Sequence, residues 1–312
     1  MKSLVTFLNK DIDNYFFSYK NHTLILILPS PDICRFRAYS GEPHDSIMVK
    51  LGYVKGKISQ SDSILFDYEE IYEISNSELK ISLYKDGSGI TISTFSGTKI
   101  FRMMDLSGIN PGHKSNITVA KNDSERYHGF GFQRKTLDAN GHRLTFKKEY
   151  RWGEATVPYF LSSDGYGFFS ANTYNHTFDF TKEHDYSIDI NGGDIDFFIM
   201  YGPGFKKIIQ SYTGLTGRPH MVPAYALGLC YVGRLFETQE GILSIARRFR
   251  EEGIPCDMIG LEPGWEKHYY QMKWIWNNEM FPHPEAMINE LHDMGYAFEL
   301  WESGDAPTSG YM

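Results

Sequence analysis

An acidic residue, Glu262, stands directly after a short apolar segment in the last quarter of the chain. The segment Met258–Leu261 has the composition of a buried strand, and Pro263 and Gly264 follow the acid. Proline cannot donate to a strand ladder and glycine permits a sharp turn, so the strand is predicted to end at Glu262. Parallel α/β enzymes place binding and catalytic groups at this end of a strand.

Two tryptophans and two further acids occupy related positions. Trp265 follows this turn, Trp301 ends the next apolar segment, and Glu302 and Asp305 come after it. An indole face can stack on a sugar ring, and a carboxylate can accept hydrogen bonds from sugar hydroxyls. Each tryptophan could equally pack in the core or at its rim, and each acid could lie in a surface loop or cap a helix. Glu262 is the strongest candidate, because charged residues rarely follow a buried strand directly.

The elements around these residues alternate between strand and helix. Thr238 is placed to cap one helix, Pro284 stands at the first position of the next, and glycines end both. The pattern predicts strands at 225–232, 257–262 and 297–301, and helices at 239–252 and from 284 to 294. Such spacing is typical of a parallel sheet with right-handed crossovers, here the first three βα units of a (β/α)8 (TIM) barrel.

The first two-thirds of the chain reads instead as short strands separated by turn residues. Residues 79–85 and 90–95 alternate apolar and polar around a glycine-rich turn, which predicts a hairpin. Further strands are expected at 23–28, 34–39, 46–54 and 196–201. Repeated strands of this kind indicate an antiparallel β-sandwich. We therefore expect two domains, a sandwich over residues 1–218 and the beginning of a barrel over residues 219–312.

Composition excludes several classes of function. A net charge of −8 at pH 7 argues against nucleic-acid and membrane-surface partners, which require clustered basic side chains. No apolar run is long enough for a transmembrane helix or a secretory signal, and three widely spaced cysteines suit reduced thiols, so a cytoplasmic location is expected. Dinucleotide and phosphate motifs are missing, and His283 and His292 are too far apart for a helical metal pair. We expect no cofactor and no metal.

Several segments together resemble glycoside hydrolase family 31, the α-glucosidase-like retaining enzymes. Segments 125–133 and 156–169 resemble a glycine-bracketed and an aromatic motif of the family's sandwich. Segments 212–219 and 223–228 resemble the entry into its barrel, and segment 257–262 resembles the second barrel strand. Order and spacing agree over roughly residues 120–305. The resemblance implies a sandwich of the galactose-mutarotase type, a catalytic barrel, and hydrolysis of O-glycosyl bonds in an α-linked glycoside or oligosaccharide.

The resemblance implies a role for only a few site residues of this chain. By position, Glu262 matches the acid that contacts sugar hydroxyls in the family's −1 subsite, where aspartate is usual, which indicates a divergent subgroup. Asp138 lies in a segment similar to the sandwich loop that reaches over the active site. In the family the nucleophile follows the fourth barrel strand and the acid/base the sixth. Both are therefore expected beyond Met312, so no catalytic residue is assigned and the chain alone is predicted to be inactive.

Two readings of the function remain open. In the first, the chain is the N-terminal portion of a family 31 glycosidase, truncated or split, with an open barrel edge that could bind a complementing C-terminal chain or a second copy. In the second, it is a non-catalytic carbohydrate-binding or structural module in which the sandwich carries the function.

Overall fold

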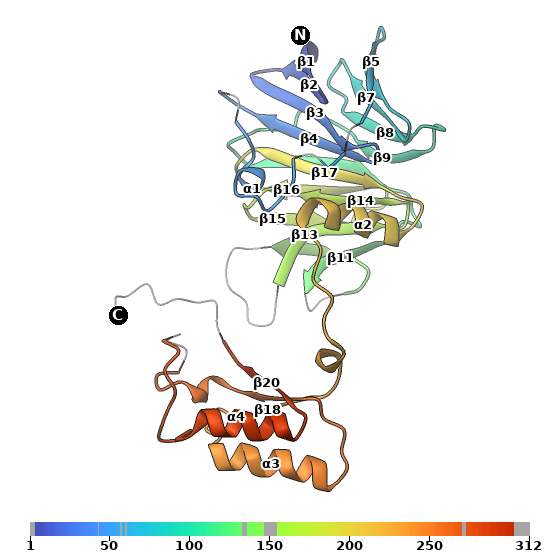
Figure 1. Cartoon of the computed structure of the whole chain (residues 1–312). Helices are drawn as coiled ribbons and strands as arrows, with labels where there is room; N and C mark the ends of the chain where they lie inside the picture. The colour runs from blue at the N-terminus through green and yellow to red at the C-terminus, as the bar shows by residue number, and fades with distance from the viewer. Residues whose placement is uncertain are drawn as a thin grey trace. The chain divides into compact units, whose positions relative to one another are not determined.

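The computed structural model describes residues 4–42, 44–56, 58–59, 61–132, 136–146, 155–269 and 273–302. The chain divides into two compact units, Met1–Arg218 and Pro219–Met312 (Figure 1). Each unit has a hydrophobic core of its own. None of the helices in the described part of the chain is both long and apolar enough to cross a membrane.

The first unit is a sandwich of two large antiparallel sheets. One sheet has the strand order β1 (Thr6–Asp11), β2 (Asn14–Tyr19), β3 (His22–Ser30), β4 (Ile33–Tyr39), β17 (Ile195–Tyr201), β14 (Tyr166–Ser170), β13 (Ala155–Ser162) and β11 (Tyr127–Phe132). The other has the order β12 (Arg143–Phe146), β15 (His176–Asp179), β16 (Asp185–Ile190), β10 (Ser115–Ala120), β9 (Lys99–Met103), β8 (Ile90–Thr94), β7 (Leu79–Tyr84), β6 (Ile71–Ser75) and β5 (Ile64–Asp67). The predicted hairpin is confirmed as β7 and β8, paired through Leu83 and Ile90.

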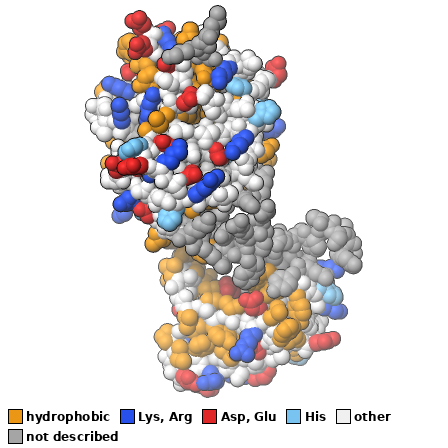
Figure 2. Space-filling view, turned by 180° about the vertical axis from the view of Figure 1, so that it is seen from behind, with side chains coloured by type: hydrophobic (Ala, Val, Ile, Leu, Met, Phe, Trp, Pro, Cys, Tyr) orange, Lys and Arg blue, Asp and Glu red, His pale blue; other side chains and the backbone are white. Residues whose placement is uncertain are grey.

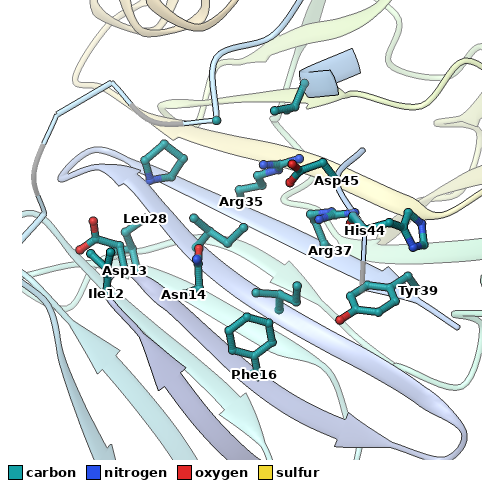
Figure 3. A pocket seen from close by; sticks show the side chains of 15 residues that line it. Ile12, Asp13, Asn14, Phe16, Leu28, Arg35, Arg37, Tyr39, His44 and Asp45 are labelled. Carbon is teal, nitrogen blue, oxygen red and sulfur yellow. The ribbon is translucent and has the colours of Figure 1, made fainter. Parts of the chain in front are cut away.

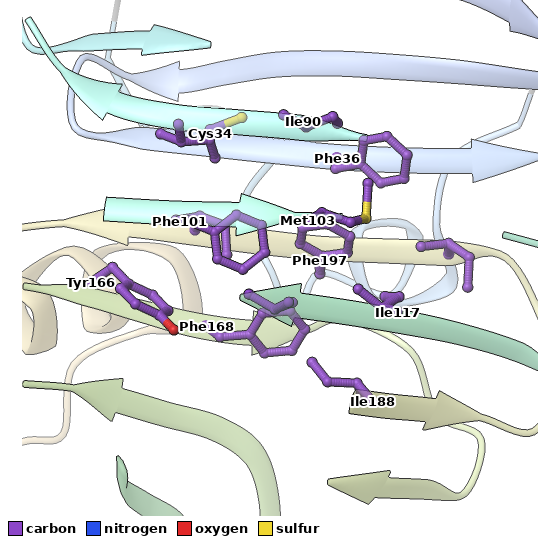
Figure 4. Close-up of a cluster of buried hydrophobic side chains, with 14 of the residues drawn as sticks. Cys34, Phe36, Ile90, Phe101, Met103, Ile117, Tyr166, Phe168, Ile188 and Phe197 are labelled. Carbon is purple, nitrogen blue, oxygen red and sulfur yellow. The ribbon is translucent and has the colours of Figure 1, made fainter. Parts of the chain in front are cut away.

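Aromatic side chains fill the space between the sheets. Figure 4 shows Phe168 and Phe197 among them, and their ring centroids lie 5.3 Å apart. Phe160 stacks on Phe168 at 5.4 Å, and all three side chains are almost completely buried. Because successive side chains of a strand point to opposite faces, the alternating pattern in the sequence supplies this core from one face of each sheet.

The outer face of the first sheet carries a second, smaller core under helix α2 (Phe205–Thr216), which buries Ile208 and Leu215. The strand expected at residues 46–54 is wrong: this segment forms the short helix α1 (Ile47–Lys50) followed by turns. Ser46 explains the difference, because its side chain accepts a hydrogen bond from the Val49 amide and caps the helix. Apolar residues that suggested strand alternation pack under α2 instead.

The second unit is a three-stranded parallel sheet with two crossover helices. The elements follow one another as η1 (Ala224–Leu227), β18 (Cys230–Gly233), α3 (Gln239–Glu251), β19 (Met258–Leu261), η2 (Pro263–Trp265), α4 (Pro284–Asp293) and β20 (Ala297–Leu300). The strand order is β18-β19-β20, and both neighbouring pairs are parallel. Thr238 caps α3 as predicted. The fold class, a sandwich followed by the first βα units of a TIM barrel, is confirmed.

One boundary in this unit differs from expectation. The strand predicted from residue 225 begins only at Cys230, because Ala224–Leu227 form a turn of 3-10 helix after Pro223. Proline is favourable at a helix start, and the amide of Gly228 closes the turn on the Tyr225 carbonyl.

Candidate functional site

The register of the parallel sheet brings residues from three strand ends to one edge. Val232, Gly260 and Glu299 are paired across the sheet. The Trp301 amide then donates to the Leu261 carbonyl at 2.9 Å, so the ladder continues one residue beyond β20. With a side-chain period of two, the next row on the same face consists of Arg234, Glu262 and Trp301.

Glu262 occupies this row with an extended backbone (φ −62°, ψ 166°) and starts the 3-10 turn η2. Its carbonyl accepts a hydrogen bond from the Trp265 amide, whereas its carboxylate makes no capping bond to the turn. The residue is half-buried. Capping of the turn therefore does not explain why an acid stands at this position.

The turn after Glu262 is fixed by close packing. A Cβ atom on Gly264 would lie 1.5 Å from the Leu235 carbonyl oxygen, so only glycine allows η2 to pack on the segment that follows β18. Trp265 is 3% exposed, and its Nε1 donates to the Trp301 carbonyl at 3.0 Å. Its ring meets Trp276 edge-on at 5.3 Å. These contacts favour the packing role of Trp265 over a sugar-stacking one.

The other predicted residues are placed differently. Trp301 is half-buried at the end of β20, and Glu302 is exposed directly after it. Asp305 lies outside the described residues. The structure therefore places Glu262 and Trp301 at the same sheet edge, and substrate contact by Glu262, Trp301 and Glu302 stays a prediction.

Asp138 belongs to the sandwich, where its carboxylate holds its own loop. One oxygen accepts hydrogen bonds from the amides of Tyr127 and Asn140, at 3.2 and 3.0 Å. The other lies 3.3 Å from the Arg126 guanidinium. These contacts explain why an aspartate stands here without a ligand, and the substrate contact expected of Asp138 stays a prediction.

Two residues of this region are missing from the sequence-based expectation. Arg234 follows β18 as Glu262 follows β19 and is exposed; the strand expected from the sequence ends at Val232, so the rule that singled out Glu262 does not reach Arg234. Glu266 is 2% exposed, and its Oε1 accepts a hydrogen bond from the Trp274 amide at 2.8 Å. No periodicity in the sequence distinguishes that buried, loop-holding acid from a surface one.

A thiol on the same sheet face is unsuited to nucleophilic chemistry. Cys230 Sγ donates to Glu299 Oε1 at 3.3 Å, across Gly260, where a Cβ atom would lie 2.8 Å from that oxygen. Burial and the neighbouring carboxylate raise the pKa of Cys230 to about 11. The thiol is therefore protonated at neutral pH and is a poor nucleophile.

A cluster of buried charges on the outer face of the sandwich is the other concentration of polar groups. Arg35 donates to both carboxylate oxygens of Asp196, at 2.8 and 2.7 Å, and both side chains are almost completely buried. Figure 3 shows Arg35 and Arg37 beside His44 and Asp45 in a hollow of about 490 Å³. Arg35 pairs with Asp196, and Arg37 binds the His44 carbonyl and lies near Asp194. These contacts stabilise the sheet and hold the loop that carries His44 against it.

The comparisons with known proteins find a family model and several relatives that match parts of the chain. Residues 219–303 match the model of the glycosyl hydrolases family 31 TIM-barrel domain. Over these residues the chain is similar to glycoside hydrolase family 31. It is 29% identical over 150 residues to the α-xylosidase XylQ of Lactiplantibacillus pentosus, an alignment covering 46% of this chain and 20% of that protein. It is 30% identical over 186 residues to α-glucosidase 2 of Bacillus thermoamyloliquefaciens, covering 55% and 23%.

A solved structure shows the same fold over nearly the whole chain. A GH31 dextranase of Flavobacterium johnsoniae, complexed with glucose, superimposes with a TM-score of 0.83 at 24% identity. The match covers 97% of this chain and 39% of the dextranase. The chain thus spans about a fifth of the two curated relatives and two-fifths of the solved neighbour.

Proposed function

We propose that this chain is the sandwich and the opening strands of the barrel of a retaining glycosidase that acts on α-linked glycosides. The observation that carries the proposal is the position of Glu262, half-buried at the C-terminal end of β19 and level with Trp301. Relatives named α-xylosidase and α-glucosidase support the substrate class.

In this proposal Glu262 binds the sugar and does not attack it. An ionised carboxylate accepts short, strong hydrogen bonds from hydroxyl groups, and two adjacent hydroxyls of a pyranose can meet its two oxygens. Arg234 and Trp301 flank it in the same row and would add a cation and an apolar surface. Retention requires two further carboxyl groups about 5–5.5 Å apart. We place both on strands that follow β20, which leaves residues 1–312 without hydrolytic activity.

Two measurements test this assignment. Purified 1–312 is expected to release no nitrophenol from nitrophenyl α-glucoside or α-xyloside, and steady release would contradict the placement of catalysis after β20. In the product of the complete reading frame, Glu262→Gln is expected to lower kcat/KM by about 10–100-fold, the loss of a charge-assisted hydrogen bond. Glu285→Gln, on the first turn of α4, is the matched control, and equal effects of the two variants would refute the role of Glu262.

The open edges of the three-stranded sheet, at β18 and β20, suggest a protein partner. Several large apolar side chains of this unit are strongly exposed, and Figure 2 shows hydrophobic side chains grouped on its surface; they include Leu229 (49%), Val232 (42%) and Phe236 (68%). An open sheet edge with exposed apolar side chains near it is expected to bind a complementing C-terminal chain or a second copy. Sedimentation of 1–312 as a monomer at micromolar concentration would exclude self-association.

The location we propose is the cytoplasm. Cys34, Cys230 and Cys256 are free thiols, and Cys34 and Cys256 are buried. Unpaired cysteines are typical of a reducing compartment. Fractionation of cells that express the protein measures this directly, and recovery in the medium would contradict it.

A further inference from the structure

We propose that the sandwich carries a second, non-catalytic site that binds a neutral sugar in a pocket beside β13, β14 and α2. The pocket has a volume of about 410 Å³, within the range of small-ligand sites. Its walls come from the segment after α1, from the loop between β14 and β15, and from α2, and include Tyr53, Tyr174 and Tyr212. None of the groups assigned to the barrel edge belongs to it.

Aromatic rings with large exposed faces form part of the wall. Tyr53 is 63% exposed and Tyr174 is 47% exposed. The Tyr174 ring lies against Gly192 and Gly193, where a Cβ atom would come within 2.8 and 2.7 Å of ring atoms. The two glycines therefore let the ring pack directly on the backbone, which fixes its orientation. A fixed aromatic face is the surface on which the C–H groups of a pyranose stack, because they meet the electron-rich face of the ring.

The loop that presents this ring is pre-organised. The side-chain amide of Asn172 donates to the carbonyls of Gly192 and Asp194, at 3.0 and 2.6 Å. Its side-chain oxygen accepts a hydrogen bond from the Tyr174 amide at 2.7 Å. The first two bonds tie the β14–β15 loop to the β16–β17 turn and the third holds the loop itself, so a ligand that stacks on Tyr174 does not have to order that loop first.

The polar groups of the pocket are uncharged. Among the described residues that line it, none is Asp, Glu, Lys or Arg, whereas several carry hydroxyl or amide groups: Thr156, Thr173, Thr216, Ser170 and Asn175. His176 also lines it and is neutral, since burial lowers its pKa to about 4. An ionic ligand would lose its hydration without a counter-charge here, so a neutral ligand is favoured.

A stacked pair of tyrosines stands at the α2 side of the pocket. Tyr212, which lines it, stacks on Tyr159 with ring centroids 3.9 Å apart. The Tyr159 hydroxyl is buried and has no hydrogen-bond partner in the described part of the chain. The stack holds the Tyr212 ring in place at the pocket wall.

Aromatic faces together with uncharged hydrogen-bonding groups suit a sugar better than a purely apolar molecule. That choice of ligand class rests on the proposed function, because the family's relatives are named for sugar substrates. The site itself rests on the pocket, its rings and its uncharged polar groups.

The test is sugar binding by the whole 1–312 chain, measured by calorimetry and saturation-transfer NMR with glucose, xylose and isomaltotriose. We expect saturable binding that Tyr174→Ala weakens at least about tenfold and Tyr174→Phe leaves within about twofold, since the ring carries the contact. Tyr53→Ala is expected to weaken binding as well and provides a second variant should Tyr174→Ala unfold. Tyr68→Ala, a 50% exposed tyrosine outside the pocket, is expected to change nothing.

The outcomes separate this site from the barrel edge. Binding that is lost in Glu262→Gln and retained in Tyr174→Ala and Tyr53→Ala would overturn the proposal while supporting the function assigned to Glu262. Binding retained in Glu262→Gln and lost in the tyrosine variants would support it independently of that function. Absence of saturable binding up to about 50 mM sugar, or binding of 1-hexanol but not of sugar, would overturn it.

Discussion

His176 makes a specific prediction about acid stability. The ring is 2% exposed; its Nδ1 lies 2.7 Å from the Tyr174 carbonyl and its Nε2 2.8 Å from Ser170 Oγ. A carbonyl only accepts, so Nδ1 carries the proton and Nε2 accepts from the serine hydroxyl. Both nitrogens are therefore satisfied in the neutral ring, and protonation would place a charge in a buried site.

The size and sign of the effect follow from the pKa. Burial lowers the pKa of His176 from 6.5 to about 4 in the folded chain. As pH falls below 6.5 the unfolded chain takes up a proton that the folded chain does not, so stability is lost between pH 6.5 and pH 4. With 1.36 kcal/mol per pKa unit, the loss is about 2 kcal/mol between pH 7 and pH 5 and about 3 kcal/mol by pH 4.

The assay is urea unfolding at pH 7, 6 and 5, followed by far-UV circular dichroism, which reports the strands of the sandwich. His176→Gln keeps one donor and one acceptor but does not titrate, so its stability should fall by about 2 kcal/mol less than that of the wild type over this range. His113→Gln, at an exposed position, controls for loss of a histidine. Parallel pH profiles for wild type and His176→Gln would refute the assignment of a neutral, buried ring.

Three further predictions concern stability. Gly264→Ala should destabilise the second unit by about 2 kcal/mol or more through overlap with a backbone carbonyl, whereas Gly204→Ala, with nothing within 4 Å, should not; tryptophan fluorescence measures it. Arg35→Met leaves the Asp196 carboxylate buried and should cost about 3–5 kcal/mol in chemical unfolding, with a near-neutral result excluding a structural role for the pair. Burial raises the pKa of Asp32, but hydrogen bonds from Ser211, Ser30 and Lys207 outweigh it and hold that pKa below its usual value. The ionised carboxylate therefore stabilises the fold above about pH 4, and this stability is lost as pH falls through the folded pKa. Asp32→Asn should make the stability less dependent on pH in this acid range, as measured by denaturant titrations.

The parts of the fold that local pattern determines could be predicted from the sequence. Alternation around a glycine-rich turn located β7 and β8, and the apolar stripe after Thr238 located α3 with its cap. These elements are local, because strands and helices of this kind are specified by neighbouring residues. The sheet order was not predictable: β4 pairs with β17, about 160 residues later in the chain, through contacts such as Ala38 with Ile195.

The secondary-structure predictions that are wrong concern short segments between turns. The apolar residues of segment 46–54 fit both the strand period of two and the helical period of 3.6, because the segment is short. The side chain of Ser46, which caps α1, decides in favour of the helix. Similarly, Pro223 starts a 3-10 turn where the apolar composition indicated a strand. Capping chemistry outweighs hydrophobic alternation when an element is only one turn long.

The candidate site shows the same division between local and non-local information. That an acid follows a buried strand is visible in the sequence, so Glu262 could be found, whereas Arg234 follows a strand whose end the sequence placed at Val232. That Trp265 packs inward depends on a non-local contact, its Nε1 bond to the Trp301 carbonyl 36 residues later. Trp265, adjacent to the acid in sequence, therefore supports the turn, whereas Trp301, in register with the acid on the next strand, is the tryptophan for which sugar contact stays a prediction. Parallel pairing, and not proximity in the chain, decides which residues share the edge of this sheet.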